Sequence, residues 1–383
     1  MKRRAGAILV ALLIALAVVW WPALLAPLAR GGIVILDVYT SALTGTNAAA
    51  VITPEPTVRE ERLVLAGAES RVTWWVPGSG GRHPGMLLVN GASPAGNDDS
   101  ETRRISEALA RAGYVVMLPE YTFLKEARLE RSAPSRVDAA FAVLLRQADV
   151  DPRRAGAFGF SVGGGILFAA ASLPGAALGD AKFLGALGAY FDIRTYLAAV
   201  VSGTQVRGGE AELWVADPLA RAKLPEGAAQ ALADPRDRDR LISAIREGDG
   251  ALAPEPPPGL GTEAAALWRA LAATTYASAL ERLNALPSDL AATFAALSPS
   301  THWRDLRVPV YWLHDEGDHF EPVSEAERAS SAPHAGATRL QVTRLLSHAA
   351  AVGAEARQQG VDFWSRELFG LLGFAFDVLR RAG

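Results

Sequence analysis

The sequence has 383 residues, half of them hydrophobic, so it is long enough to bury a large core. Its formal net charge is -3 and its Lys and Arg residues are dispersed, which excludes the basic surface typical of nucleic-acid-binding proteins. No Cys is present, so disulfides, thiolate nucleophiles and Cys-ligated metal sites are excluded.

A basic cluster followed by a long uncharged run marks the N-terminus. Lys2, Arg3 and Arg4 precede residues 5–29, which contain no charged side chain. The run is longer than the apolar region of a cleaved signal peptide, about 7–15 residues, and exceeds the about 20 residues that span a bilayer. Because basic residues stay on the cytoplasmic side, we predict a transmembrane helix within residues 1–30, retained as a signal anchor. It would be a single pass, with the remainder of the chain on the extracytoplasmic side.

Two alternatives compete with the single-pass anchor. Cleavage of the apolar run as a signal peptide would give a secreted protein. A second crossing over residues 32–52 would return the chain to the cytoplasm, but Asp37 and several Thr, Ser and Asn side chains make that crossing costly. We predict instead a linker over residues 31–57, which contains the segment Pro54-Glu55-Pro56.

Beyond the linker, the apolar pattern is typical of an α/β domain. Residues 63–65 and 72–76 predict a strand hairpin, because a turn with a glycine separates them. Continuous apolar runs over 86–89 and 114–118 predict strands that are covered on both faces, and a helix beginning near Asp98 joins them.

The same alternation continues along the chain. A helix from Ser135 leads to a strand that ends at Phe160, and further strands are predicted over 183–190, 308–313 and 338–345. Strands that alternate with helices at this spacing predict a mostly parallel sheet with helices on both faces. The fold class is therefore α/β.

A long insertion interrupts this pattern. Residues 196–300 contain Ala-rich helical segments and a proline-rich break at 254–258. Because the insertion is too long for a plain loop, we predict a helical cap over the C-terminal edge of the sheet. The core then consists of two parts, residues 58–195 and 301–383.

The pentapeptide Gly159-Phe160-Ser161-Val162-Gly163 lies where a predicted strand turns into a predicted helix. Its glycines remove the Cβ atoms that would collide across so sharp a turn, and Ser161 projects its hydroxyl alone. A Ser hydroxyl is a poor nucleophile, so it needs a base to take its proton and an acid to orient that base.

Open parallel sheets place ligands at the C-terminal ends of their strands, and a base and an acid are found there. His348 follows the strand over 338–345, and Asp318 follows the strand over 308–313. We predict that His348 is the base and Asp318 the acid. Turnover should then fall on the acid side near the ordinary imidazole pKa of about 6.5.

Other titratable side chains near these strand ends are alternatives. Asp192, after the strand over 183–190, and Asp315 are alternative acids. His314 and His319 flank the acid, and we expect them to line or support its loop. No His-x-x-x-His spacing is present, so we expect neither a metal nor another cofactor.

Together these features resemble an α/β-hydrolase of the dienelactone hydrolase-like and esterase branch. The similarity rests on residues 159–163, on the segment 313–318 with Pro322 after it, and on His348. The resemblance implies a serine hydrolase that cleaves a small-molecule carboxylic ester through an acyl-enzyme on Ser161. Dienelactone hydrolases proper use Cys at that position, so their particular lactone chemistry is not expected.

The triad of Ser161, His348 and Asp318 leaves other activities open. A peptidase or an acyltransferase would use it equally, because only the pocket under the cap decides between them. A relative without catalysis would act as a membrane-bound binding or scaffold protein.

The oxyanion that forms on attack needs two donors, normally backbone N–H groups. Val162, directly after the nucleophile, is one candidate donor. Ala92, in the loop after the strand over 86–89, is the other.

Overall fold

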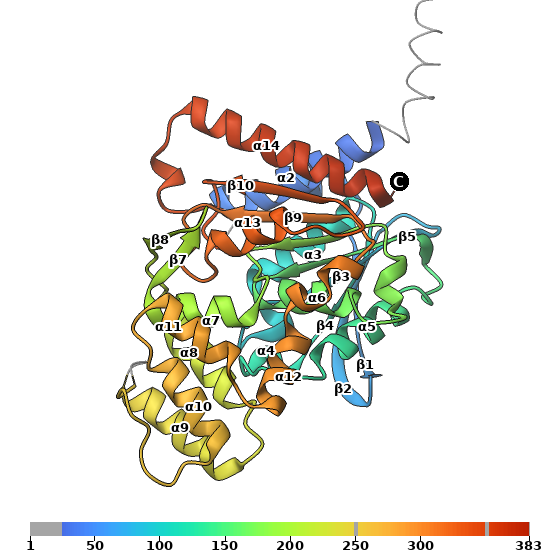
Figure 1. The fold of residues 1–383 in the computed structure, drawn as a ribbon. Helices are drawn as coiled ribbons and strands as arrows, with labels where there is room; N and C mark the ends of the chain where they lie inside the picture. Colours follow the sequence, from blue (N-terminus) through green and yellow to red (C-terminus); the bar gives the residue numbers. More distant parts are fainter. Residues whose placement is uncertain (1–24, 249–251, 349–351, 383) are drawn as a thin grey trace, which may run out of the picture.

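The computed structural model describes residues 25–248, 252–348 and 352–382. Its central feature is an eight-stranded sheet in the order β1-β2-β4-β3-β5-β6-β9-β10 (Figure 1). β1 and β2 form an antiparallel hairpin, β2 runs antiparallel to β4, and the other neighbours are parallel, which confirms the mostly parallel sheet. The strands are β1 (Thr57–Leu65), β2 (Ala68–Val76), β3 (His83–Val89), β4 (Val115–Pro119), β5 (Val150–Phe160), β6 (Leu184–Leu187), β9 (Val310–Asp315) and β10 (Thr338–Thr343).

Helices cover both faces of the sheet (Figure 1). One face carries α5 (Ala133–Leu144) and α6 (Val162–Ala171). The other face carries α2 (Ala26–Thr44), α3 (Ser100–Arg111) and α14 (Val361–Leu379). The shorter helices α4 (Thr122–Lys125) and α13 (Val323–Ser331) follow β4 and β9.

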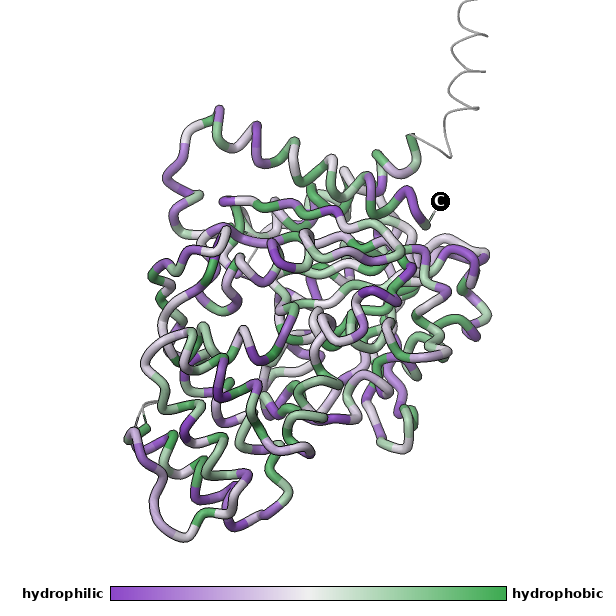
Figure 2. Tube along the Cα trace, viewed as in Figure 1, coloured by the Kyte–Doolittle hydropathy of each residue, from purple (hydrophilic) through white to green (hydrophobic). Residues whose placement is uncertain are grey.

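The central strands are buried as their sequences require. Every residue of β4 is buried, as is every residue of β3 after the first, because helices lie above and below them. Hydrophobic residues are frequent along these strands, and hydrophilic residues along the outer loops (Figure 2). The helix expected near Asp98 begins at Ser100, because Asp99 is the residue whose side chain caps it by accepting from Thr102 N–H.

The chain between β6 and β9 forms a mainly helical unit beside the sheet, which we call the cap. Its elements are α7 (Ile193–Ser202), β7 (Thr204–Arg207), β8 (Glu210–Leu213), α8 (Pro218–Ala229), α9 (Pro235–Glu247), α10 (Thr262–Leu271), α11 (Tyr276–Asn284) and α12 (Ser288–Leu297). The β7-β8 hairpin was not expected from the sequence. It leads into a segment that contacts the loop after β9, since Trp214 Nε1 donates to Asp318 O at 2.7 Å.

Residues 31–57, expected to be a linker, contain most of α2. This helix packs along α14 and α3, and its Asp37 is only 1% exposed. The linker prediction is therefore wrong over residues 31–44. Its polar side chains suggested a solvated segment, but α14, from the far end of the chain, covers one side of the helix.

The predicted membrane anchor cannot be placed in the fold. Residues 5–24 of the apolar run lie outside the described residues. Among the described ranges, no helix is both long and apolar enough to cross a membrane. The alternative second crossing over 32–52 coincides with α2, which packs on the domain.

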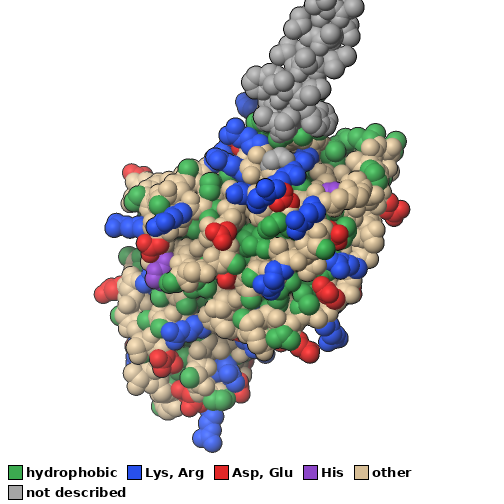
Figure 3. Space-filling view, turned by 90° about the vertical axis from the view of Figure 1, so that its right-hand side faces the viewer, with side chains coloured by type: hydrophobic (Ala, Val, Ile, Leu, Met, Phe, Trp, Pro, Cys, Tyr) green, Lys and Arg blue, Asp and Glu red, His purple; other side chains and the backbone are tan. Residues whose placement is uncertain are grey.

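The start of α2 and the end of α14 lie close together. The Tyr114 hydroxyl donates to Leu379 O at 3.2 Å, and Arg30 lies over the Tyr114 ring. Arg154 Nε donates to Ala382 O at 2.7 Å. Figure 3 shows this side of the molecule, where Lys and Arg side chains gather in the upper part of the view.

Candidate active site

Ser161 is the single residue between the end of β5 and the start of α6. Its backbone has φ 51° and ψ -135°, a conformation that non-glycine residues rarely adopt. Ser161 N–H donates to Leu187 O at 2.8 Å, which ties the turn to the end of β6. The structure thus contains the strained strand-to-helix turn that the pentapeptide predicts.

Two glycines of the pentapeptide are required by close backbone contacts. A Cβ on Gly159 would lie 2.5 Å from Gly164 Cα, and a Cβ on Gly163 would overlap with Asn90 O. No side chain fits at either position. Gly163 therefore lets the loop after β3 lie directly against the start of α6.

The predicted acid and base are in contact. His348 Nδ1 lies 2.9 Å from Asp318 Oδ2 and 3.1 Å from Asp318 Oδ1. Asp318 is buried, and the N–H groups of Phe320 and Glu321 donate to its Oδ1, which fixes the carboxylate in the loop after β9. His348 has φ 47°, and its ring stacks on Phe320. With Nδ1 turned to Asp318, Nε2 is the ring nitrogen left to accept a proton.

Ser161 is not hydrogen-bonded to His348 among the described residues. Its Oγ donates instead to Glu321 Oε1 at 2.7 Å. The Glu321 side chain is 0% exposed, and its Oε2 lies 3.3 Å from His348 Nδ1. Glu321 therefore contacts both the predicted nucleophile and the predicted base.

Sequence reasoning missed Glu321. Its only signal is an acidic residue three positions after Asp318 and directly before Pro322. Loop carboxylates are usually exposed, so that signal is weak. The burial arises because the loop after β9 folds back over Asp318, with Glu321 N–H bound to the Asp318 carboxylate.

Burial changes the protonation of Glu321. It raises the pKa of the carboxyl to about 8, although the charge on His348 opposes the increase, and the charge on Asp318 adds to it. Near neutral pH, Glu321 therefore holds a proton. The pKa of Asp318 moves the other way: burial would raise it, but the charge and hydrogen bond of His348 hold it below its usual range.

The acidic side chains around His348 also change its pKa. Burial alone would lower the pKa of His348, but the Asp318 and Glu321 carboxylates outweigh it and raise the pKa to about 9. This pKa differs from the ordinary imidazole value near 6.5 that the sequence suggested. The reason is that His348 has two acids within hydrogen-bonding or ion-pair distance rather than one.

His314 and Asp315 lie beside the predicted acid and base and hold their loops. His314 is fully buried, its Nε2 lies 3.0 Å from Glu321 O, and its Nδ1 accepts from Trp312 Nε1. Burial lowers the pKa of His314, so the neutral ring donates to the backbone of Glu321. Burial raises the pKa of Asp315 to about 6, and its carboxyl accepts from Gly317 N–H.

The remaining alternatives lie elsewhere. Asp192 caps α7 and pairs with Arg194 at 2.7 Å and with Ser300 Oγ at 2.7 Å, so its carboxylate is occupied away from His348. His319 Nδ1 lies 2.8 Å from Val215 O, which connects the acid loop to the cap.

The loop after β3 is held in place by Asn90. Its Oδ1 accepts from Gly91 N–H at 2.9 Å and from Thr102 Oγ1 at 2.8 Å, and its Nδ2 donates to Gly96 O. A Cβ on Gly91 would lie 3.1 Å from Ser161 Cβ, so the loop passes directly beside the predicted nucleophile. Ala92 is the next residue of this loop, and Val162 begins α6 on the other side.

Asp318, Glu321 and His348 are also a possible cation site, because their ligand atoms lie within 4.8 Å of one another. The same atoms already hold each other and Ser161 by hydrogen bonds and an ion pair. A cation bound there would have to displace the proton between His348 and Asp318.

Comparison with known proteins gives no sequence relative. A scan against protein-family models finds no match, and a search of curated proteins finds none. Among solved structures, the 2,6-dihydroxy-pseudo-oxynicotine hydrolase matches with a TM-score of 0.50 and 13% identity, over 85% of this chain and 68% of that chain. This chain has the α/β-hydrolase fold.

Two other solved structures of lower similarity are the acylaminoacyl peptidase of Pyrococcus horikoshii and a dienelactone hydrolase from Anabaena variabilis ATCC 29413. The peptidase matches with a TM-score of 0.49 and 13% identity, over 84% of this chain and 42% of that chain, so this chain spans less than half of it. The dienelactone hydrolase matches with a TM-score of 0.42 and 12% identity, over 85% of this chain and 97% of that chain.

The α/β-hydrolase fold explains why distant residues meet. Ser161 follows β5, Asp318 follows β9 and His348 follows β10, so all three lie at the C-terminal ends of parallel strands. β6 lies between β5 and β9, and a Cβ on Gly188, just past β6, would lie 3.0 Å from Asp318 Oδ2. The absence of a side chain there makes room for the Asp318 and His348 pair.

Proposed function

We propose that this protein is a serine hydrolase that cleaves carboxylic esters through an acyl-enzyme on Ser161. The observation that carries the proposal is the His348 and Asp318 pair beside a Ser held in a strand-to-helix turn of positive φ. Glu321 touches both Ser161 and His348, so these two groups lie at one site. The choice of esters follows the similarity of the motifs to esterases.

The reaction begins when Ser161 Oγ attacks the ester carbonyl carbon and its proton passes to His348 Nε2. The ester C–O bond then breaks, and the leaving alcohol takes that proton. Water attacks the acyl-enzyme, its proton goes to His348, and the bond between Ser161 Oγ and the acyl carbon breaks. The acid leaves and Ser161 regains its proton. Asp318 stabilises the imidazolium in both halves of the reaction.

The oxyanion in each half is stabilised by the backbone N–H groups of Val162 and Ala92. Asn90 and Gly91 support this assignment, because they fix the loop that precedes Ala92 against Ser161. Before attack, the Ser161 hydroxyl has to turn from Glu321 to His348 Nε2. The arrangement with Glu321 is thus a resting one.

Labelling with a fluorophosphonate probe tests the proposal directly. Ser161→Ala should abolish labelling and lower turnover of nitrophenyl esters by roughly 10⁴-fold or more, with the fold unchanged by circular dichroism. His348→Ala should be about as severe. His319→Ala, which removes a contact to the cap, is the control and should be much milder. Full activity in Ser161→Ala would exclude the mechanism, and turnover of anilides in preference to esters would make the enzyme a peptidase.

We propose further that the enzyme is tethered to a membrane by its N-terminal segment, with the catalytic domain on the extracytoplasmic side. The support is the uncharged run over residues 5–29 after Lys2, Arg3 and Arg4. The full-length protein should then stay in membranes through high salt and alkaline wash. Protease added outside the inner membrane should digest the domain, and complete protection would contradict this orientation.

A further inference from the structure

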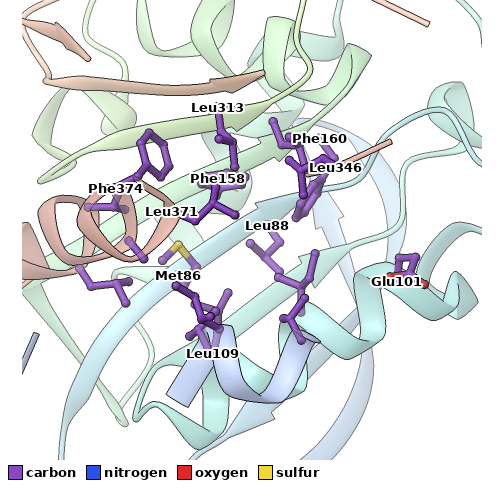
Figure 4. Close-up of a pocket in the computed structure, with 18 of the residues that line it drawn as sticks. Met86, Leu88, Glu101, Leu109, Phe158, Phe160, Leu313, Leu346, Leu371 and Phe374 are labelled. Carbon is purple, nitrogen blue, oxygen red and sulfur yellow. The ribbon is translucent and has the colours of Figure 1, made fainter. Parts of the chain in front are cut away.

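An apolar cavity of about 170 Å³ lies between the sheet and the helices α2, α3 and α14 (Figure 4). Met86 and Leu88 of β3 and Phe158 and Phe160 of β5 form its wall on the sheet side. α14 closes it with residues that include Phe374. The cavity therefore lies within the core on the α2 side of the sheet, away from the cap.

The lining is almost entirely hydrocarbon. Among the described residues that line it, Glu101 is the one charged side chain, and the others are apolar apart from the Tyr39 hydroxyl. The Glu101 carboxylate is paired with Arg104 at 2.7 Å, and its side chain is 34% exposed, so it lies at the rim. Water gains few hydrogen bonds in such a space, and an apolar cavity of about 150 Å³ in another protein stays dry and binds benzene.

The cavity is long in one direction. Its wall on α14 extends from Leu371 to Leu379, a distance of about 12 Å at about 1.5 Å per helical residue. On α2 the wall extends from Val34 to Tyr39. A long, narrow apolar space fits an unbranched chain better than a compact ring.

One end of the cavity is lined by residues that are close in sequence to the candidate active site. Phe160 immediately precedes Ser161, and Leu346 precedes His348 by two residues. Glu101 is in the first turn of α3, directly after the loop that contains Ala92. The Glu101 rim is therefore at the same edge of the sheet as the nucleophile.

We propose that this cavity binds the unbranched hydrocarbon chain of a neutral, lipid-like molecule, with the polar end of that molecule at Glu101. The Glu101 carboxylate at the rim can accept a hydrogen bond from a hydroxyl, and its ion pair with Arg104 offsets the guanidinium charge that would otherwise attract a fatty-acid anion. Such a hydrocarbon chain can belong either to an ester substrate or to a separate lipid. Binding itself does not depend on the hydrolase proposal.

Photolabelling of the full-length Ser161→Ala chain tests the proposal without hydrolysis. The probe is an octanol analogue that carries a diazirine at the end of its chain, and adducts are mapped by mass spectrometry. We expect adducts on peptides that contain Val34, Met86 or Phe374, and competition by 1-octanol but not by octanoate. Adducts confined to the exposed apolar residues Leu213, Val215 and Leu219 of the cap would overturn the proposal.

Two matched variants of α2 make the test specific. Val34→Phe places a larger side chain in the cavity and should reduce labelling of the Phe374 peptide at least about tenfold. Leu36→Phe adds the same ring at a position that is 38% exposed, and it should leave labelling unchanged. If Val34→Phe does not fold, Leu313→Phe fills the cavity from β9 instead. Equal labelling in the cavity-filling and control variants would refute the site.

Kinetic measurements on the active enzyme distinguish whether the ester substrate or a separate lipid supplies the bound hydrocarbon chain. If the ester substrate supplies it, Val34→Phe raises KM for nitrophenyl octanoate and leaves KM for nitrophenyl acetate unchanged. If a separate lipid supplies it, both KM values stay the same while the loss of photolabelling persists. If the protein proves to have no hydrolase activity, the labelling experiment still decides on the cavity.

Discussion

The Ser161 hydroxyl is hydrogen-bonded to the buried Glu321 carboxyl, 2.7 Å away, although His348 is the residue that the proposed mechanism needs as its base. Glu321 Oε2 also lies 3.3 Å from His348 Nδ1, so one side chain influences both reacting groups. The protonation of Glu321 should therefore affect how readily Ser161 becomes available and how strongly His348 holds its own proton.

The wild-type enzyme should be most active in mildly alkaline solution. His348 must be neutral to accept the Ser161 proton, and its pKa is raised to about 9. Since the protonated form dominates below that pKa, kcat/KM for a nitrophenyl ester should rise about tenfold per pH unit between pH 6 and 8 and level off near 9. Ser161→Ala supplies the blank for chemical hydrolysis. A plateau already reached at pH 7 would contradict the raised pKa.

Glu321→Gln should move the acid limb of that profile to lower pH. The amide oxygen can still accept from Ser161, but the negative charge that raises the pKa of His348 is gone. The pKa of His348 should fall, and kcat/KM should increase most above about pH 8, where Glu321 is ionised in the wild type. Glu316→Gln is the matched control on the same loop, because Glu316 is 40% exposed and pairs with Arg207. A profile unchanged in Glu321→Gln would mean that Asp318 alone sets the pKa.

Asp37→Asn should stabilise the fold at neutral pH. Asp37 is 1% exposed, neither of its carboxyl oxygens has a hydrogen-bond partner among the described residues, and burial raises its pKa to about 6. Because the folded chain holds this proton more tightly than the unfolded chain, stability falls as the pH rises from about 4 to 6. The variant should gain roughly 1–2 kcal/mol in free energy of unfolding at pH 7.5 and almost nothing at pH 4.

Denaturant unfolding at both pH values measures this difference. Asp239→Asn, on the exposed surface of α9, is the control and should show no pH-dependent gain. A loss of stability in Asp37→Asn at pH 7.5 would show that the charge of Asp37 is compensated by Arg104 or Arg111, the nearby basic residues.

Two truncations at the N-terminus should differ sharply in the stability of the folded chain. A chain that starts at residue 25 keeps α2 and should unfold cooperatively. A chain that starts at residue 54 lacks α2, so the faces of α14 and α3 that pack on it become exposed, and it should aggregate or unfold at a lower temperature. Size-exclusion chromatography and thermal unfolding by circular dichroism measure both. Equal stability of the two chains would make α2 dispensable.

The sequence predicts the sheet well because the signals are local. The unbroken apolar runs of β3 and β4 can only belong to covered strands, and the glycines around Ser161 are required by backbone contacts within a few residues or with the neighbouring loop. Asp318 and His348 follow from the rule that parallel strands end at one edge.

The errors have a common physical origin in contacts between distant parts of the chain. α2 has polar residues at several positions, and its apolar side is buried against α3 and against α14, which follows more than three hundred residues later. Glu321 carries no local sign of burial. The pKa of His348 is raised first by Asp318 and then by Glu321, and the sequence indicated only the first of these two neighbours.

Ser161 and His348 are two of the four described non-glycine residues with positive φ, at 51° and 47°. Such a backbone costs about 1–3 kcal/mol at each residue, and glycine would relieve it. Glycine at either position should therefore raise the stability of the fold while it removes a side chain that the proposed mechanism needs. Under the proposed mechanism, the side chains of Ser161 and His348 are thus kept at a cost in folding stability.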